Sequence, residues 1–268
     1  MKRIAIFLIL FALAWLNGPN ADAQFNKLSG CDQFGFCSIN NSNLIPIGNA
    51  CSIVSGTTTT FTAQGIGNAN PNRTSVVSIN WGDSTLAGTA EITNVTLGGV
   101  SMLRGVRAAG DDQNSNSEIW YLANPTGTSA NIVVTTSTAI DGITIGVYSL
   151  IGYATAPIST TVGTTSASLA YSNKQVALEA GSRTINVSTS LSNLTNDFSS
   201  ACGPNLWGVH ASGRLNGNGQ TLTSTISPTS DNPKIALAIW TAVATACDQT
   251  GLIFSVDCNM VLVPALIH

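Results

Sequence analysis

Few residues of this sequence have the types and spacing that chemistry on a substrate requires. The chain has two histidines, of which His268 is the last residue and His210 is interior. A Ser-His-Asp hydrolase needs a histidine beside an activated hydroxyl, and the chain contains no Gly-x-Ser-x-Gly elbow. We therefore expect His210 to be a satisfied histidine of a β-sandwich or a loop edge. A glycoside-acting enzyme needs two facing carboxyl groups about 5–10 Å apart, and the scattered Asp and Glu residues neither support nor exclude such a pair.

One acidic cluster could hold a metal ion. Asp111 and Asp112 are followed by asparagines at alternate positions, which is similar to the opening of a calcium loop. The helix-loop-helix form also requires Gly at the sixth position and Glu at the twelfth, which here are Ser117 and Ala123. A looser calcium site at Asp111 and Asp112 stays open, although a polar hairpin loop is the interpretation we favour. We expect no other cofactor.

Two tryptophans lie near loops, where an exposed ring could stack on a sugar. Trp81 precedes a Gly-Asp pair, and Trp207 follows Gly-Pro-Asn. Trp120 and Trp240 lie inside apolar runs and are expected in the core. Packing in or beside the core is the alternative that we favour for Trp81 and Trp207, because large aromatic side chains contribute so much buried area.

The N-terminus indicates that the chain is secreted. A short basic start is followed by the apolar run Ile4–Leu16 and by Ala21-Asp22-Ala23, a small-x-small pattern that a signal peptidase recognises. The run is shorter than the roughly 20 residues of a membrane span, so we predict a signal peptide at 1–23 and no transmembrane segment. Residues 28–31, Leu-Ser-Gly-Cys, spell a bacterial lipid-anchor site. They lie well past the apolar run, so we favour the cleaved, unlipidated form.

Secretion changes the meaning of the six cysteines, because an even number in an oxidising compartment predicts disulfides. A zinc site needs close Cys-x₂₋₄-Cys pairs, and none occurs. We expect a local loop between Cys31 and Cys37, with the other cysteines joining the ends of the main domain. The cysteines are Cys31, Cys37, Cys51, Cys202, Cys247 and Cys258.

Composition disfavours one class of partner. Charged residues make up 9% of the chain, against about 25% in ordinary soluble domains. The formal net charge is −3 and no basic patch occurs, so a nucleic-acid partner is not expected. The polar surface must come from Thr, Ser and Asn, which suit strands and turns better than helix interiors.

The elements that would position these residues are strands. Short alternating or β-branched runs recur between Gly, Pro, Asn and Asp, which is typical of a sandwich or barrel. Gly98-Gly99 predicts a tight hairpin turn, and Asn124–Gly127 predicts a second turn. Ala236–Ala246 could form a helix, although we favour a strand. The predicted strands are Thr58–Ala63, Ser75–Trp81, Glu91–Leu97, Val100–Val106, Ile119–Ala123, Asn131–Ser137, Ile143–Tyr153, Ser168–Ser172, Gln175–Glu179, Thr184–Thr189, Leu206–Ala211, Gln220–Ile226, Lys234–Ala242 and Leu252–Val263.

Several motifs of this sequence resemble those of a known family. Val-Thr-Leu-Gly-Gly-Val occurs at Val95–Val100, and an Ile-Trp hairpin ending in Pro-Thr-Gly-Thr at Ile119–Thr128. Aliphatic strands follow at Ile132–Thr135 and Gly142–Tyr148. Between about residues 75 and 190 the chain resembles an all-β module of secreted alphaproteobacterial proteins and of phage or prophage structural proteins of the tail or surface. The resemblance implies a jelly-roll-like sandwich used structurally or adhesively, with no known reaction.

We therefore expect an all-β protein, a jelly-roll-like β-sandwich of two antiparallel sheets without an evident internal repeat. The sandwich domain is expected at 51–268, after a short Cys-containing N-terminal leader at 24–50. The predicted location is extracellular, on a cell surface or on a virion. The predicted partners are further copies of the chain or a particle or cell-surface component. A lectin-like, glycan-binding domain is the alternative, and a glycoside-acting enzyme the third hypothesis.

Overall fold

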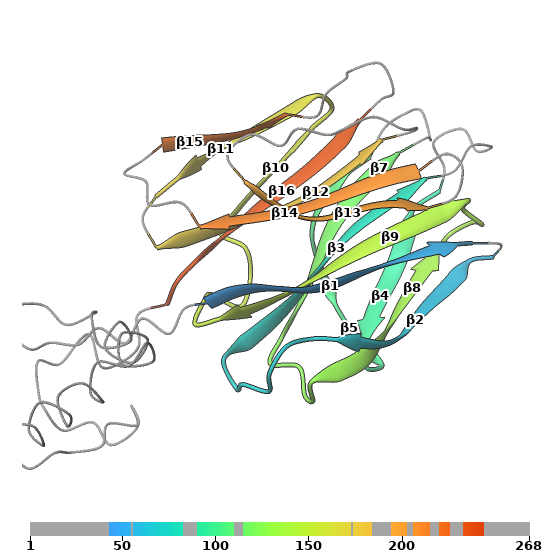
Figure 1. Cartoon of the computed structure of the whole chain (residues 1–268), viewed down its shortest axis with the longest axis horizontal. Helices are drawn as coiled ribbons and strands as arrows, with labels where there is room; N and C mark the ends of the chain where they lie inside the picture. Colours follow the sequence, from blue (N-terminus) through green and yellow to red (C-terminus); the bar gives the residue numbers. More distant parts are fainter. Residues whose placement is uncertain are drawn as a thin grey trace, which may run out of the picture. The chain divides into compact units, whose positions relative to one another are not determined.

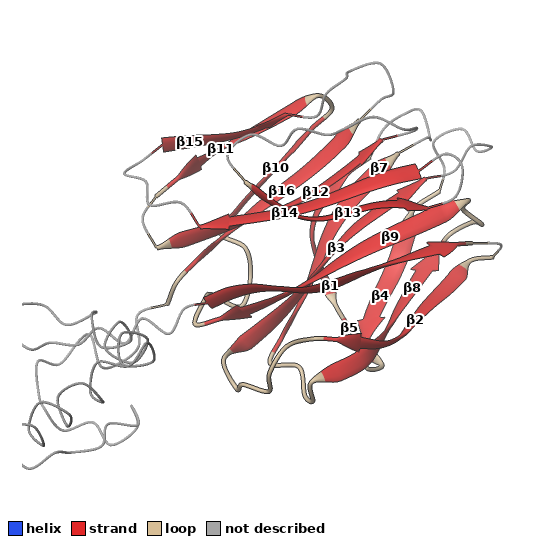
Figure 2. Ribbon diagram, viewed as in Figure 1, coloured by secondary structure: helices blue, strands red, loops and turns tan. Residues whose placement is uncertain are grey.

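The computed structural model describes residues 43–54, 56–82, 90–109, 115–172, 174–183, 194–202, 206–214, 220–225 and 233–243. These residues form 16 β-strands and no helix (Figure 1, Figure 2). All pairings among the described strands are antiparallel. The all-β class that the recurring short runs predicted is confirmed.

The first nine strands form one sandwich, here called the first sandwich. Its two sheets have the orders β1-β9-β3-β7-β6 and β2-β8-β4-β5. The outermost strands in sequence pair with each other, β1 with β9, and pairing continues inward through β2/β8 and β3/β7 to β4/β5. This nested pairing is a rolled-up hairpin, the jelly roll, as predicted. The strands are β1 (Asn43–Ile53), β2 (Thr58–Gly65), β3 (Arg73–Gly82), β4 (Ile92–Leu97), β5 (Val100–Ser101), β6 (Leu103–Ala108), β7 (Asn116–Ala123), β8 (Ser129–Thr136) and β9 (Gly142–Ile151).

The remaining strands repeat this pattern in a second sandwich. Its sheets have the orders β10-β16-β12-β14-β13 and β11-β15, and β10/β16, β11/β15 and β12/β14 are again nested pairs. Position for position, its five-stranded sheet has the same order as that of the first sandwich. The chain therefore has four sheets instead of two, and a repeat of topology that the sequence did not reveal. The strands are β10 (Ser159–Gly163), β11 (Ser166–Tyr171), β12 (Gln175–Arg183), β13 (Thr195–Cys202), β14 (Leu206–Arg214), β15 (Gln220–Thr225) and β16 (Lys234–Thr241).

The two five-stranded sheets face each other, and their contacts come in symmetric pairs. Strand β1 lies against β13 just as β10 lies against β6, and β9 lies against β14 just as β16 lies against β7. Strands β3 and β12, which occupy equivalent positions, contact each other at the centre. This is the pattern of a two-fold interface, here formed within one chain.

The stacking explains why some strands are buried along their whole length. Every residue of β3 is buried, because this strand has a sheet on both of its faces. Successive side chains alternate between the faces. Val77 and Ile79 join the core of the first sandwich, and Val76 joins the core between the five-stranded sheets. A third cluster, which includes Leu222 and Leu237, lies within the second sandwich.

Three local predictions agree with the structure. Gly98 and Gly99 have φ angles of 59° and 83° and join β4 to β5 with Leu97 opposite Val100, so the hairpin is confirmed. The segment Asn124–Gly127 connects β7 and β8, as predicted. The Ala-rich segment is strand over Lys234–Thr241.

Other local expectations differ from the structure. The boundary expected between residues 50 and 51 falls inside β1, so residues 43–50 form part of the first strand. Strands β10 and β13 were not predicted, because their Ser-, Thr- and Asn-rich sequences lack apolar alternation. The strands predicted at 184–189 and 252–263 lie outside the described residues.

Candidate functional site

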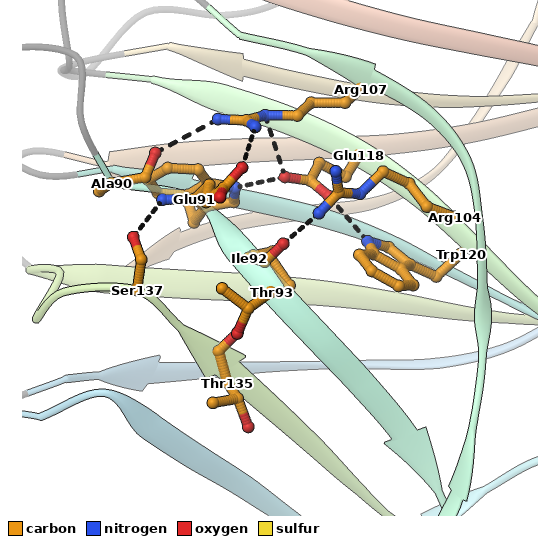
Figure 3. Close-up of polar contacts among 11 residues, drawn as sticks. Ala90, Glu91, Ile92, Thr93, Arg104, Arg107, Glu118, Trp120, Thr135 and Ser137 are labelled. Carbon is orange, nitrogen blue, oxygen red and sulfur yellow. Dashed lines mark hydrogen bonds and ion pairs between the residues drawn. The ribbon is translucent and has the colours of Figure 1, made fainter.

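The most charged cluster among the described residues surrounds the buried carboxylate of Glu118 on β7 (Figure 3). Its Oε2 atom accepts a hydrogen bond from Trp120 Nε1 at 2.8 Å and lies 3.1 Å from Arg104 Nε. Its Oε1 atom accepts a hydrogen bond from Trp81 Nε1 at 3.3 Å and lies 3.6 Å from Arg107 Nε. We call these five residues the Glu118 cluster. Both oxygens of the carboxylate are therefore engaged.

A β-bulge in β6 brings both arginines to the same carboxylate. Residues three apart on a regular strand point to opposite faces, yet Arg104 lies opposite Trp120 and Arg107 lies opposite Glu118. The register shifts between Arg104 and Val106, and the extra residue, Gly105, returns Arg107 to the face of Arg104. The bulge is thus a feature of the cluster.

Burial and the neighbouring charges have opposite effects on the pKa of the Glu118 carboxyl group. Burial raises the pKa of Glu118, and the two guanidinium groups and two indole N–H groups counteract this rise. Arg107 also pairs with Glu91 Oε2 at 2.8 Å, and Arg104 donates to the carbonyl oxygen of Ile92 and lies over the Trp120 ring, 4.8 Å from its centroid. The cluster fastens β3, β6, β7 and the start of β4, and both oxygens of its carboxylate have partners within the protein.

A second polar group lies between the two five-stranded sheets. His210 on β14 is fully buried. Its Nδ1 atom lies 2.7 Å from Ser78 Oγ, and its Nε2 atom lies 3.3 Å from both Asn80 Nδ2 and Thr144 Oγ1. Burial lowers the pKa of His210 to about 3, so the imidazole is neutral near pH 7.

The hydrogen-bond pattern assigns the proton of His210. The Asn80 side-chain NH₂ group donates to Nε2, because the same nitrogen also donates to the carbonyl oxygen of Val209 at 3.3 Å, which an amide oxygen could not do. A neutral imidazole has one N–H, so Nδ1 carries it and donates to Ser78. The Ser78 hydroxyl donates in turn to the Gly146 carbonyl at 3.1 Å. Ser78 is thus an acceptor toward His210, and this pair is not a nucleophile with its base. His210 is a satisfied sandwich histidine, as predicted.

Two glycines allow the sheets to approach at this point. A Cβ atom on Gly146 would lie 2.7 Å from His210 Cγ, and one on Gly208 would lie 2.1 Å from Thr144 Oγ1. Real Cβ atoms do not make such contacts, so each position excludes a side chain. The layer around His210 is therefore packed without space for a ligand.

Arg73 is a buried cation that binds only to carbonyl oxygens in the described residues. Its Nη1 atom donates to Gly67 and Asn68 at 2.7 and 2.8 Å, and its Nη2 atom donates to Pro125 and Gly127 at 2.7 and 2.9 Å. Burial lowers the pKa of Arg73. The side chain ties two turns of the first sandwich together, and the four carbonyl groups bind both terminal nitrogens of its guanidinium.

Glu179 on β12 is a buried carboxyl group of a different kind. It points between the sheets of the second sandwich, and neither of its oxygens has a hydrogen-bond partner among the described residues. Burial raises the pKa of Glu179 to about 7, and the nearby Ser224 hydroxyl opposes this rise only in part. Neither Glu179 nor Glu118 was predicted from the sequence as a site residue. For Glu118, the sequence did contain a signal. Trp120 lies two residues later, on the same face of a strand, and two arginines lie shortly before it in the chain.

A disulfide joins the two sandwiches. Cys51 on β1 and Cys202 on β13 are bonded across a sequence separation of 151 residues, with their Cα atoms 5.6 Å apart. The predicted disulfide bonding is confirmed for this pair. The other four cysteines, Cys31, Cys37, Cys247 and Cys258, lie outside the described residues.

The sequence-predicted ligand residues do not form a site in the described part of the chain. Trp81 is 1% exposed and belongs to the Glu118 cluster, so its ring is not available for stacking on a sugar. The backbone of Trp207 lies in β14 opposite Arg183 and Ala201. Asp111 and Asp112 lie outside the described residues. Within the described ranges, no three His, Cys, Asp or Glu residues are grouped as metal ligands.

No family model, curated protein or solved structure matches this chain. None of the described segments is a helix long and apolar enough to cross a membrane. The fold and the clusters define a class: two stacked jelly-roll sandwiches clamped by a disulfide, with polar groups that bind one another.

Proposed function

We propose that this chain is a secreted, non-catalytic structural or adhesive module carried on a cell surface or a virion. The observation that supports it best is the closure of the polar clusters. The Glu118 carboxylate is engaged at both oxygens, and the His210 imidazole is engaged at both nitrogens. An active site needs groups that are free to bind or exchange a proton with a substrate.

Three further features fit this proposal. The Cys51–Cys202 disulfide is the chemistry of an oxidising compartment, which agrees with the predicted signal peptide at 1–23. The disulfide and the interlayer hydrogen bonds hold the two sandwiches rigidly, as a load-carrying module requires. The resemblance to tail and surface proteins of phages and to secreted alphaproteobacterial proteins points the same way.

Density-gradient fractionation of the native source tests the proposal. Intact-mass measurement without reductant follows the chain through the fractions. We expect recovery with envelope or particles, a mass that begins at Gln24 and fully oxidised cysteines. Recovery of the chain free in the medium would contradict the proposal.

A polysaccharide column tests the glycan-binding alternative in parallel. Under our proposal the chain is not retained, and Trp207→Ala or a calcium chelator changes nothing. Retention that is lost on either treatment would replace the structural function with a lectin-like one, with Trp207 or the Asp111-Asp112 segment at the site.

A further inference from the structure

The stack of two five-stranded sheets has two rims that the pseudo-two-fold symmetry makes equivalent, yet they differ. We call the edge formed by β1 and β13 the closed rim. There Leu44 and Phe198 pack against the core between the sheets, and Cys51–Cys202 joins the two strands. At the edge formed by β6 and β10, Val106 and Ala108 of β6 belong to the core between the sheets, but no described residue of β10 does and no disulfide joins the two strands. We call this edge the open rim.

Three large apolar side chains are exposed at the open rim. Leu103 on β6 is 61% exposed, and Val162 on β10 and the adjacent Ile158 are 49% and 54% exposed. The two strands are in contact, and Pro157 lies close to Gly105 of β6. Apolar groups gathered at one edge in this way are typical of protein interaction sites.

These side chains continue the core between the sheets. Leu103 lies opposite Tyr121 and Val162 lies opposite Ala236. Tyr121 and Ala236 both belong to the core between the five-stranded sheets, and opposite residues point to the same face. Ile158 directly precedes β10, and its backbone N–H donates to the carbonyl oxygen of Ile239 on the neighbouring strand β16 at 2.8 Å. The open rim is thus the uncovered margin of an interface that already holds the two sandwiches together.

The strand β10 also lacks the features that protect sheet edges. Natural edges carry bulges, prolines or charges. The edge strands β1, β6 and β13 all have shifts in register, and Pro46 and Asp197 lie at two of them. By contrast, β10 has the sequence Ser-Thr-Thr-Val-Gly, without a proline or a charged residue, and it pairs with β16 without a shift in register. Among the described strands, β10 pairs on one side only (Figure 1).

We propose that the open rim binds a second copy of this chain, with β10 paired antiparallel to β10 of the copy and the exposed apolar strip buried. The inference rests on the proposed function, for which it names the partner. A two-fold axis at Thr161 would place Thr160 opposite Val162, so no like charges meet, and the five-stranded sheet that contains β10 would continue into the same sheet of the copy. A charged ligand fits less well, because the nearby Arg104 and Arg107 are paired with Glu118 and Glu91.

Sedimentation velocity of the full-length secreted chain over a concentration series tests this proposal. We expect a dimer in the wild type and an increase of its dissociation constant by at least roughly 100-fold in Val162→Lys, because the dimer would bury an unpaired ammonium group. The side chain is half exposed, so the variant monomer should unfold at the wild-type temperature. Ile53→Lys is the matched control, since Ile53 is 72% exposed on β1 at the closed rim, and we expect it to dimerise like the wild type.

Hydrogen exchange supplies the second measurement. Amides of Ser159–Gly163 should be more protected at dimer-forming concentrations than in the Val162→Lys variant. A wild-type monomer at about 100 μM, a dimer that survives Val162→Lys, or a dimer that Ile53→Lys dissociates would overturn the proposal. A monomer recovered with particles would contradict only the dimer formed through the open rim. A dimer found free in the medium would contradict only the proposed function.

Discussion

The Nδ1 atom of His210 lies 2.7 Å from the Oγ atom of Ser78, although 132 positions separate the two residues in the chain. One residue belongs to the second sandwich and the other to the first, so this contact is part of the junction between them. A buried hydrogen bond of this kind specifies one alignment of the two sheets, because a shifted alignment would leave polar groups unpaired.

The His210 junction should make the protein less stable in mild acid. The pKa of His210 is about 3 in the folded protein and about 6.5 in an unfolded chain. The stabilisation is complete above pH 6.5 and is lost as the pH falls toward 3, because the unfolded chain takes up the proton first. Thermal unfolding of wild type and His210→Gln should therefore show a difference in Tm that shrinks from pH 7 to pH 4. A constant difference would contradict the prediction.

Glu179 should produce the opposite dependence. The pKa of Glu179 is about 7 in the folded protein, and its ordinary value, which we take for the unfolded chain, is 4.5. The folded state therefore keeps a proton that the unfolded chain loses, and this contribution is complete below pH 4.5 and disappears as the pH rises through 7. The shift corresponds to about 3 kcal/mol. Urea unfolding at pH 5 and pH 8 should show that Glu179→Gln gains stability relative to wild type at the higher pH. Equal differences at both pH values would refute the assignment.

The buried Glu118 cluster should stabilise the folded protein far more than the exposed ion pair at its margin does. Glu118→Gln leaves two partly buried guanidinium groups without their shared carboxylate, and breaking a buried pair costs about 3–5 kcal/mol. Glu91→Gln is the matched control, because this carboxylate pairs with the same Arg107 but is 48% exposed, and such pairs contribute about 1 kcal/mol or less. Denaturant unfolding of both variants measures the contrast. Similar losses in the two variants would show that the burial of Glu118 does not matter.

The approach of the sheets at His210 can be tested with a single methyl group. Gly146→Ala places Cβ 2.7 Å from His210 Cγ, and overpacking of this kind costs about 1–3 kcal/mol. Gly48→Ala is the control, since its Cβ would have no atom within 4 Å. Differential scanning calorimetry should show a lower Tm for the first variant alone. An unchanged Tm in Gly146→Ala would mean that the two sheets can separate slightly without loss.

Part of the fold could be predicted because the information is local. The β-branched runs of β3, β4 and β9 indicate strands by alternation and propensity. The two glycines after Leu97 indicate a turn, because the positive φ angles there require glycine. The polar strands β10 and β13 carry no alternation, and they are strands because neighbouring strands supply their hydrogen bonds.

The residue pattern was sufficient to predict the all-β class, most strand positions, the tight turn at Gly98-Gly99 and the pairing of cysteines. The pairing of Cys51 with Cys202, the burial of Glu118 and His210, and the repeat of one strand order in both sandwiches are known only from the folded chain. A period of two in the sequence assigns a side chain to a face of its strand. It does not say which distant strand lies alongside or which sheet covers that face, because these contacts join segments more than 100 residues apart.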